Sequence, residues 1–426
     1  MSTSLFKIRP QTRECQQRRG LEEEIHRLNM ALRDTDVEGK GKSLQGKKIL
    51  LGVTGGIASV DTVRLCREFR RYGAELTVIM TPSAQKIITP LAVKWAAQCD
   101  VITDFDSDLE ALNHMDAIVV APATRHILAS TVHGFQHGPL LMALSVARNR
   151  QTPAIFVPSM HEDLAEEPVT RELCERIISD GAHVLWGSLD EGKRKTPSHE
   201  AIVAHTSHLV HSASTSASVV ITLGATKSHI DDIRYVANTS TGSTGWGIAD
   251  MLYRYGHDVS CVVGLTTQPQ PSWLPLCIHA PTPEKMLNEC IALSNDSIDV
   301  WIHTAAVLDY VVKEPVEGKI ASQQGVLEFQ LQESLKHIHE LRDRCKDALR
   351  IGFKLESGIK QKDLVYRAHA QIQHSEMNAV IANRLEDLNQ REKPRAYLVD
   401  EQGVDFALQT IDEMHEAIRT LIDNRG

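Results

Sequence analysis

Short apolar runs alternate with longer stretches of helical character from Lys48 almost to the end of the chain. A first series lies at residues 48–53, 75–80, 117–123, 154–159 and 183–186, and a second at 219–224, 258–263, 299–307, 349–353, 378–383 and 397–400. Apolar strands separated by helices are typical of parallel β-α-β units. The pattern predicts an α/β protein with two doubly wound open sheets, the first flavodoxin- or Rossmann-like and the second Rossmann-like. Ligand sites are expected where the strands end.

The break between the two series predicts a domain boundary. At 426 residues the chain is long for a single core, and the small polar stretch at 211–218 separates the series. We expect one domain at residues 47–190, a linker at 191–217 and a second domain at 218–426. Within residues 1–46, apolar side chains recur at helical spacing, which predicts a helical extension at the N-terminus; they are Leu21, Ile25, Leu28 and Leu32.

The composition excludes several classes of protein. The net charge of −9, without a basic run, argues against a nucleic-acid partner. No apolar stretch reaches the roughly 18 residues that a membrane helix needs, and the first residues lack the apolar core of a signal peptide. The eight cysteines are scattered and form no Cys-x-x-Cys pair. We therefore expect a reduced, cytoplasmic protein without a zinc site or a disulfide framework, and we expect no membrane partner.

Thr54, Gly55 and Gly56 directly follow the first apolar run. A strand that ends in such a small-residue turn before a helix exposes backbone N–H groups and the positive end of a helix dipole, which together can seat a phosphate. A plain tight turn is the alternative reading. The same arrangement recurs at residues 218–247, and this second copy favours a phosphate site.

Three ordered motifs stand in the second half of the chain: 221–249 with its glycine-rich turn, 304–322 with Ala-Ala-Val-x-Asp-Tyr and a later Lys-Ile, and 351–356 followed by Val-Ile-Ala-Asn at 380–383. Together they resemble phosphopantothenate–cysteine ligases over about 200 residues. The first motif is carried by Ile221, Thr222, Gly224, Thr226, Ile230, Asp231, Arg234, Asn238, Ser240, Gly242 and Gly245.

The resemblance implies ligation of 4′-phosphopantothenate to cysteine through an acyl-nucleotide, with CTP or ATP as co-substrate and Mg²⁺ on the triphosphate. Lys319 would neutralise the triphosphate and the leaving pyrophosphate. Asp309 would orient the base or sugar, and Asn238 would hold the acyl-nucleotide by an uncharged hydrogen bond. The implied nucleotide-binding residues are Gly224, Thr226, Ala306, Asp309, Lys319 and Phe353. No protein-held metal is expected.

The second half departs from the bacterial pattern of this family. Ser228 replaces an acidic residue, residues 333–336 replace a Lys-Asn-Pro-Asp segment, and Gln371 and Ser375 replace a pair of lysines. The stretches at 353–356 and 371–383 are more similar to the monofunctional ligases of eukaryotes. The choice between CTP and ATP is therefore left open.

Residues 48–190 resemble the flavin-dependent cysteine decarboxylases that precede the ligase in bifunctional coenzyme A biosynthesis proteins. Four short motifs carry the resemblance: 52–58, 81–84, 121–124 and 158–160. It implies that flavin mononucleotide (FMN) is bound by Thr54, Gly55, Gly56, Ser83, Ala121, Thr124 and Met160. His161 follows the last motif, as in some archaeal-type members, and is a candidate catalytic residue.

The decarboxylase pattern is incomplete. Asp108 stands where the family has its decarboxylating histidine, and no cysteine lies between Cys174 and Cys261, where many members place a flap cysteine. His126 and His137 also replace residues of the family pattern. Without an imidazole near the thiol and a proton donor on the flap, decarboxylation is expected to be slow or absent. Because His126 and His137 replace family contacts, FMN binding is expected to be weak or partial.

Two alternatives stay open beside the bifunctional reading. One is a ligase of the same chemistry that acts on another carboxylate, with the first domain as a scaffold. The other is a non-catalytic assembly or regulatory homologue. The resemblance also implies a homo-oligomer, with paired ligase domains and trimeric flavoprotein domains.

Overall fold

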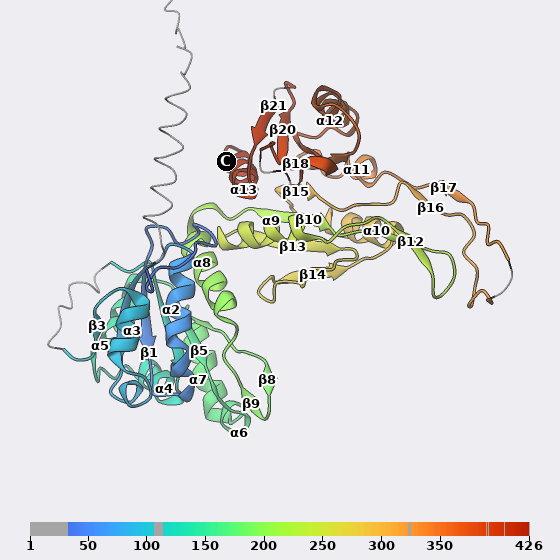
Figure 1. The fold of residues 1–426 in the computed structure, drawn as a ribbon. Coiled ribbons are helices and arrows are strands. Elements are labelled where there is room, and N and C mark those ends of the chain that lie inside the picture. The colour runs from blue at the N-terminus through green and yellow to red at the C-terminus, as the bar shows by residue number, and fades with distance from the viewer. Residues whose placement is uncertain are drawn as a thin grey trace, which may run out of the picture.

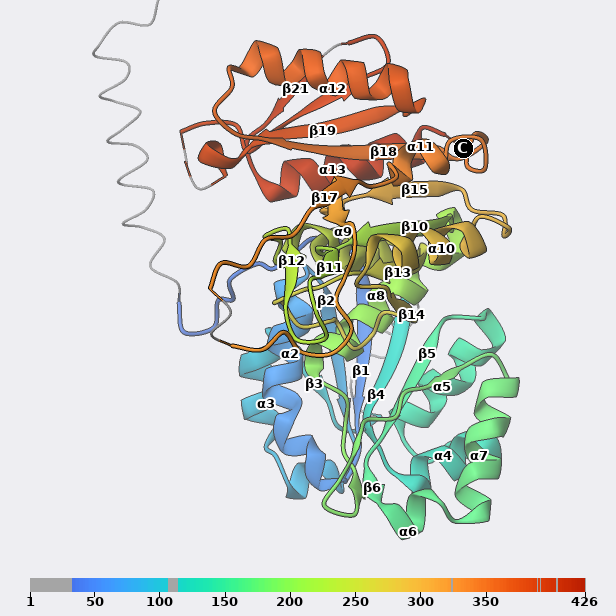
Figure 2. The same ribbon diagram turned by 90° about the vertical axis from the view of Figure 1, so that its right-hand side faces the viewer.

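The computed structural model describes residues 33–105, 114–322, 325–388, 390, 392–403 and 405–425. The predicted helix around Leu21–Leu32 and the position of Asp108 lie outside these residues. Two sheets organise the described chain, one built from its first half and the other from its second half (Figures 1 and 2). Within the described residues, no helix is long and apolar enough to cross a membrane.

The first sheet has six parallel strands in the order β3-β2-β1-β4-β5-β7. Its central strand, β1, is buried after its first residue, as the continuous apolar run requires. The order reverses between β1 and β4, which makes their carboxyl ends the switch point of a doubly wound sheet. The strands are β1 (Lys48–Val53), β2 (Glu75–Met80), β3 (Val101–Ile102), β4 (Ala117–Ala123), β5 (Ala154–Pro158) and β7 (His183–Val184).

Helices cover both faces of this sheet. One face packs against α2 (Thr62–Arg71), α3 (Pro90–Ala97) and α8 (His199–Thr215). The other packs against α4 (Arg125–Val132), α5 (Pro139–Arg150) and α7 (Pro168–Ser179).

The second sheet has eight strands in the order β14-β13-β10-β15-β18-β19-β20-β21, and only β20 runs antiparallel to the others. Its switch point lies between β10 and β15. The strands are β10 (Ser218–Leu223), β13 (Asp258–Val263), β14 (Leu276–His279), β15 (Val300–His303), β18 (Leu349–Glu356), β19 (Ala379–Arg384), β20 (Ala396–Asp400) and β21 (Asp405–Leu408).

Helices α9 (Ser243–Arg254) and α13 (Ile411–Asp423) cover one face of the second sheet. The opposite face packs against α10 (Pro283–Leu293) and α12 (Gln361–Ser375), and the short helix α11 (His337–Glu340) leads into β18. The predicted fold class, an α/β chain with two doubly wound sheets, is confirmed.

Three small β-structures lie outside the two main sheets. Strands β11 (Lys227–His229) and β12 (Tyr235–Ala237) form one hairpin, and β16 (Tyr310–Val312) pairs with β17 (Leu331–Glu333); both project from the second sheet in Figure 1. In the first half, β6 (Met160–His161), β9 (Lys193–Arg194) and β8 (Leu189–Asp190) form a three-stranded sheet, with the one-turn helix α6 (Glu162–Ala165) after β6.

Helix α8 lies in the segment expected as a linker, residues 191–217, and contacts both halves. It packs against α2 on one side and α9 on the other. The connection between the two sheets is thus partly helical and is held by contacts with each half.

Candidate functional sites

Six of the seven flavin residues implied by the sequence lie together at the switch point of the first sheet, and the seventh, Met160, lies in β6. Thr54 follows β1, and its buried hydroxyl donates to the carbonyl of Pro122 at 2.7 Å. The same hydroxyl accepts the N–H of Thr124 at 3.1 Å. Ala121, within β4, is buried beside them. Thr54 therefore joins the loops after β1 and β4.

The two glycines of the turn allow these loops to approach one another closely. A Cβ on Gly55 would stand 2.3 Å from the Cβ of Ser83 in the loop after β2, well inside van der Waals contact. A Cβ on Gly56 would contact Pro122 and Thr124. The backbone here forms a cradle that a larger residue would fill, which fits an approaching phosphate.

The helix expected directly after the glycines begins later than the sequence indicates. A 3₁₀ helix at Ile57–Asp61 follows Gly56, and α2 starts only at Thr62. The N–H groups nearest the turn therefore belong to the 3₁₀ helix. The positive end of the α2 macrodipole lies at Thr62, after this 3₁₀ helix.

His161 lies beside an acidic side chain that the sequence analysis did not single out. Its Nδ1 is 3.2 Å from Oδ2 of Asp163, and the imidazole is more than half exposed. The hairpin β8–β9 pairs with β6, so that Lys193 lies opposite His161, while Met160 lies opposite Arg194. A contact between residues 161 and 193 cannot be predicted from one sequence, because register depends on where the hairpin turns.

The ligase motifs also meet, at the switch point of the second sheet. Gly224 directly follows β10, with φ +79°, and its carbonyl accepts the N–H of Ala306 at 2.8 Å. Thr226 is buried: its N–H donates to the carbonyl of Ala306, and its hydroxyl accepts the N–H of Leu308 at 2.8 Å. Thr226 thus fixes the loop after β15.

Asn238 joins the first motif to the second. Its side-chain amide donates to the carbonyls of Ala306 and Val307, each at 3.1 Å, and the residue is exposed. Phe353 lies half-buried in β18, the strand beside β15. Four of the implied nucleotide residues, Gly224, Thr226, Ala306 and Phe353, therefore lie on or beside adjacent strands, next to Asn238.

The two charged residues of the predicted site, Asp309 and Lys319, lie in loops of the second half. Asp309 forms an ion pair with Lys336, with Nζ and Oδ1 2.7 Å apart, and both side chains are exposed. Lys336 belongs to the segment that departs from the bacterial pattern, so sequence reasoning gave it no role. Lys319 is exposed in the long connection between β16 and β17. In the described part of the chain, no three His, Cys, Asp or Glu side chains are placed to hold a metal ion.

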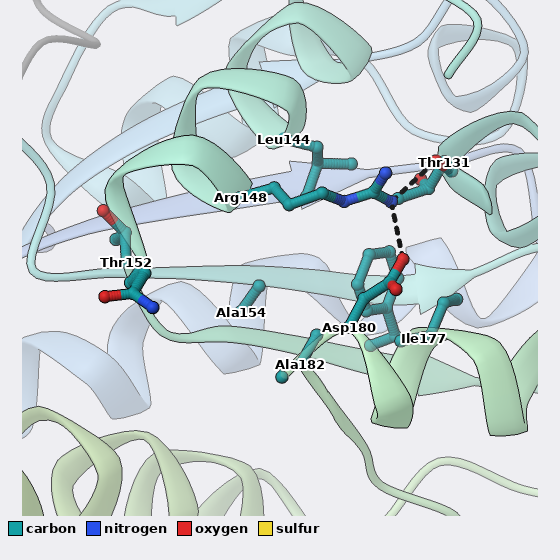
Figure 3. Close-up of a pocket in the computed structure, with 11 residues that line it drawn as sticks. Thr131, Leu144, Arg148, Thr152, Ala154, Ile177, Asp180 and Ala182 are labelled. Carbon is teal, nitrogen blue, oxygen red and sulfur yellow. Dashed lines mark hydrogen bonds and ion pairs between the residues drawn. The ribbon is translucent and has the colours of Figure 1, made fainter. Parts of the chain in front are cut away.

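A cavity of about 230 Å³ lies at the other end of the first sheet (Figure 3). Arg148 extends across it, donates to the carbonyl of Thr131 at 2.8 Å and lies 3.6 Å from Asp180. Ala154, at the start of β5, lines its floor. The flavin residues follow the carboxyl ends of the strands, so this cavity is separate from them.

Fold and sites together define a two-part α/β protein with one candidate ligand site at the switch point of each sheet. The Flavoprotein family model matches residues 38–211, and that of the DNA/pantothenate metabolism flavoprotein C-terminal domain matches residues 214–424. The chain is 32% identical over 377 residues to the coenzyme A biosynthesis bifunctional protein CoaBC of Thermococcus kodakarensis, covering 86% of this chain and 92% of that protein. It is 31% identical over 355 residues to the CoaBC of Methanocaldococcus jannaschii, covering 81% and 85%.

This chain belongs to the family of bifunctional coenzyme A biosynthesis proteins. Among solved structures, it is similar to the DNA/pantothenate metabolism flavoprotein from Streptococcus pneumoniae, with 25% identity and a TM-score of 0.44, covering 49% of this chain and all of that one.

Proposed function

We propose that the second half of the chain ligates 4′-phosphopantothenate to cysteine through an acyl-nucleotide. The observation that carries this proposal is the meeting of the two main motifs at one switch point, where Asn238 donates to the carbonyls of Ala306 and Val307. An open α/β sheet binds its ligands at this place. Family membership supports the same chemistry.

Each candidate residue has a part in this reaction. Lys319 neutralises the triphosphate and the departing pyrophosphate, where negative charge develops. Asp309, oriented by Lys336, holds the base or sugar of the nucleotide. Asn238 stabilises the acyl-nucleotide without a charge of its own. Mg²⁺ would be bound by the oxygens of the triphosphate and would help to neutralise its charge.

The first half is proposed to bind FMN weakly or partially. Thr54, Gly55, Gly56 and Ser83 form the cradle for its phosphate, and Thr124 borders the cradle. Bound FMN would accept and return the electron pair that oxidative decarboxylation of a cysteinyl group requires. His161, whose imidazole lies beside Asp163, is proposed to move a proton in that reaction.

The chain is also proposed to assemble with copies of itself. Apolar side chains are exposed along the β16–β17 hairpin and its connection, among them Tyr310, Phe329 and Leu331. Side chains of this kind on a projecting hairpin favour burial against another subunit. Light scattering on the purified protein would give a mass above that of one chain.

The test of the ligase is pyrophosphate release, with CTP and separately with ATP, in the presence of 4′-phosphopantothenate and Mg²⁺ and then with cysteine added. Wild-type protein should release pyrophosphate with one nucleotide or both. Lys319→Ala should slow release about a hundredfold, the effect of losing about 3 kcal/mol of charge stabilisation. Asn238→Asp should block formation or aminolysis of the intermediate, because it sets a carboxylate beside an anion.

The outcomes separate the readings. Wild-type protein that releases no pyrophosphate with either nucleotide would overturn the ligase function. Pyrophosphate release with another carboxylate in place of 4′-phosphopantothenate would change the assigned substrate but keep the assigned reaction. Release that survives Lys319→Ala unchanged would remove only the role given to that lysine.

A further inference from the structure

Two loops of the second half are joined by a ladder of hydrogen bonds: residues 230–234, in the β11–β12 hairpin, and residues 316–320, in the β16–β17 connection. The N–H of Val316 donates to the carbonyl of Ile230 at 2.9 Å. Asp232 and Gly318 are joined twice, by Asp232 N–H to the Gly318 carbonyl at 3.1 Å and by Gly318 N–H to the Asp232 carboxylate at 3.2 Å. The second loop carries Lys319.

Asp231 is the buried centre of this ladder. Its side chain has no exposed surface, and its carboxylate pairs with the guanidinium of Arg234. It accepts the N–H groups of Ile233 at 2.8 Å and Arg234 at 2.6 Å, and also the N–H of Ile320 at 3.2 Å. Arg234 in turn donates to the carbonyl of Ile320 at 3.3 Å. We call this arrangement the Asp231 clamp.

The hydrogen-bond donors around the Asp231 carboxylate stabilise its negative charge. Burial opposes ionisation, but the N–H groups of Arg234, Ile233 and Ile320 and the Arg234 guanidinium outweigh it and lower the pKa of Asp231 to about 2. The carboxylate is therefore ionised at every pH at which the enzyme would work. Replacing it leaves several buried donors without an acceptor.

The clamp grips the backbone on both sides of Lys319. Gly318 is bonded to Asp232, and Ile320 to Asp231 and Arg234, while the lysine side chain between them is exposed. A long lysine side chain has many rotamers and loses conformational entropy when it is ordered. A fixed backbone limits the positions that its ammonium group can reach, and a misplacement of about 1 Å can cost about a hundredfold in rate.

We propose that Asp231 is a positioning residue that acts through Lys319, by holding the backbone from which this lysine reaches the triphosphate. The inference rests on the proposed ligase function. It assigns a catalytic consequence to a buried carboxylate that is itself screened from substrate.

The test combines Asp231→Asn with Lys319→Ala. An asparagine keeps the shape of the side chain but has only one acceptor oxygen. Its NH₂ group, itself a donor, would then face the N–H of Ile320 and the Arg234 guanidinium, which are also donors. Asp231→Asn alone should lower kcat for pyrophosphate release about 10- to 100-fold, with a smaller change in nucleotide KM. In the Lys319→Ala background, the same substitution should change the rate less than about twofold, because the group it positions is gone.

Asp387→Asn is the matched control. Asp387 is likewise buried and pairs with an arginine three residues away, Arg384, with Nε and Oδ2 2.6 Å apart, but it has no contact with residues 316–320 in this structure. The Asp387→Asn variant should lose stability without a comparable fall in kcat. Amide hydrogen exchange gives a readout that needs no activity: Asp231→Asn should speed exchange of the segment 316–320, and Asp387→Asn should not.

These outcomes distinguish the two proposals. Wild-type protein without pyrophosphate release would overturn the ligase function, and the catalytic part of this inference with it. If the wild type is active, and the fold-losses in rate caused by Asp231→Asn and Lys319→Ala multiply in the double variant, the positioning role alone is overturned. Unchanged exchange at 316–320 in Asp231→Asn would overturn the clamp, whatever the activity.

Discussion

The guanidinium of Arg254 stacks on the ring of Tyr72, with Cζ 4.2 Å from the ring centroid. Tyr72 directly follows α2 in the first half and Arg254 is the last residue of α9 in the second, so this contact joins the two halves of the chain. Arg254 is only 3% exposed, and its Nε donates to both carboxylate oxygens of Asp250. Trp273 lies on the guanidinium as well, 5.2 Å from centroid to Cζ, and donates to Asp250.

We predict that Tyr72→Leu lowers the free energy of unfolding by about 2 kcal/mol, since it removes a desolvated cation–π contact and leaves a guanidinium face without a ring. Tyr72→Phe keeps the ring and should cost about 0.5 kcal/mol or less. Urea unfolding of the full chain measures both. Equal losses for the two variants would show that the hydroxyl, and not the stacked ring, carries the contribution.

We predict that Thr226→Val costs about 1–3 kcal/mol of stability, because the buried N–H of Leu308 loses its acceptor while the shape of the side chain is kept. The loop after β15 carries Ala306 and Asp309, so nucleotide KM should rise about tenfold, the equivalent of about 1.4 kcal/mol. Thr226→Ser retains the hydroxyl and is the control. A Val variant with wild-type stability and KM would contradict this account of Thr226.

The fold was predictable from the sequence because its strongest signal, the spacing of apolar runs, reports which segments are buried on both sides. Right-handed crossovers limit the strand orders that such a chain can adopt, but they do not single one out, and the order itself came from the structure. The 3₁₀ helix at Ile57–Asp61 was not predictable, since no breaker residue separates it from α2. Pairings such as Asp309 with Lys336, or Asp231 with Ile320, were also beyond one sequence. They join residues 27 and 89 positions apart through loop geometry that no local pattern encodes.

We predict that acid destabilises the junction between the halves through His205. Burial, followed by the charges of His208, His183 and Arg254, lowers the pKa of His205 to about 4 from an ordinary 6.5. The Tyr253 hydroxyl lies 2.7 Å from its Nδ1, and burial raises the pKa of Tyr253 to about 12, so the tyrosine remains a donor to the neutral imidazole. The unfolded chain takes up this proton first as pH falls.

The stability due to neutral His205 is therefore fully present above about pH 6.5 and is lost progressively toward pH 4, by up to about 3 kcal/mol. His205→Gln should be less stable than wild type at pH 7, but its stability should fall less steeply between pH 6.5 and 4. His133→Gln, at an exposed position away from this junction, is the control variant. Urea unfolding at a series of pH values measures these slopes, and identical slopes for wild type and His205→Gln would refute the prediction.

The last prediction concerns the cradle at Gly55. Alanine there would place its Cβ 2.3 Å from the Cβ of Ser83 and 3.1 Å from the Ser83 carbonyl carbon, so one of the two loops must move. These loops are proposed to receive the FMN phosphate, and their displacement should raise the dissociation constant for FMN at least about tenfold. Quenching of flavin fluorescence during a titration measures this dissociation constant.

Gly39→Ala is the control, since its nearest neighbour, the carbonyl oxygen of Arg71, would stand 4.0 Å from the new Cβ. Both variants should keep the wild-type circular dichroism spectrum. Wild-type affinity in Gly55→Ala would place the flavin phosphate elsewhere, and a wild-type chain that binds no FMN at all would leave this cradle a structural turn.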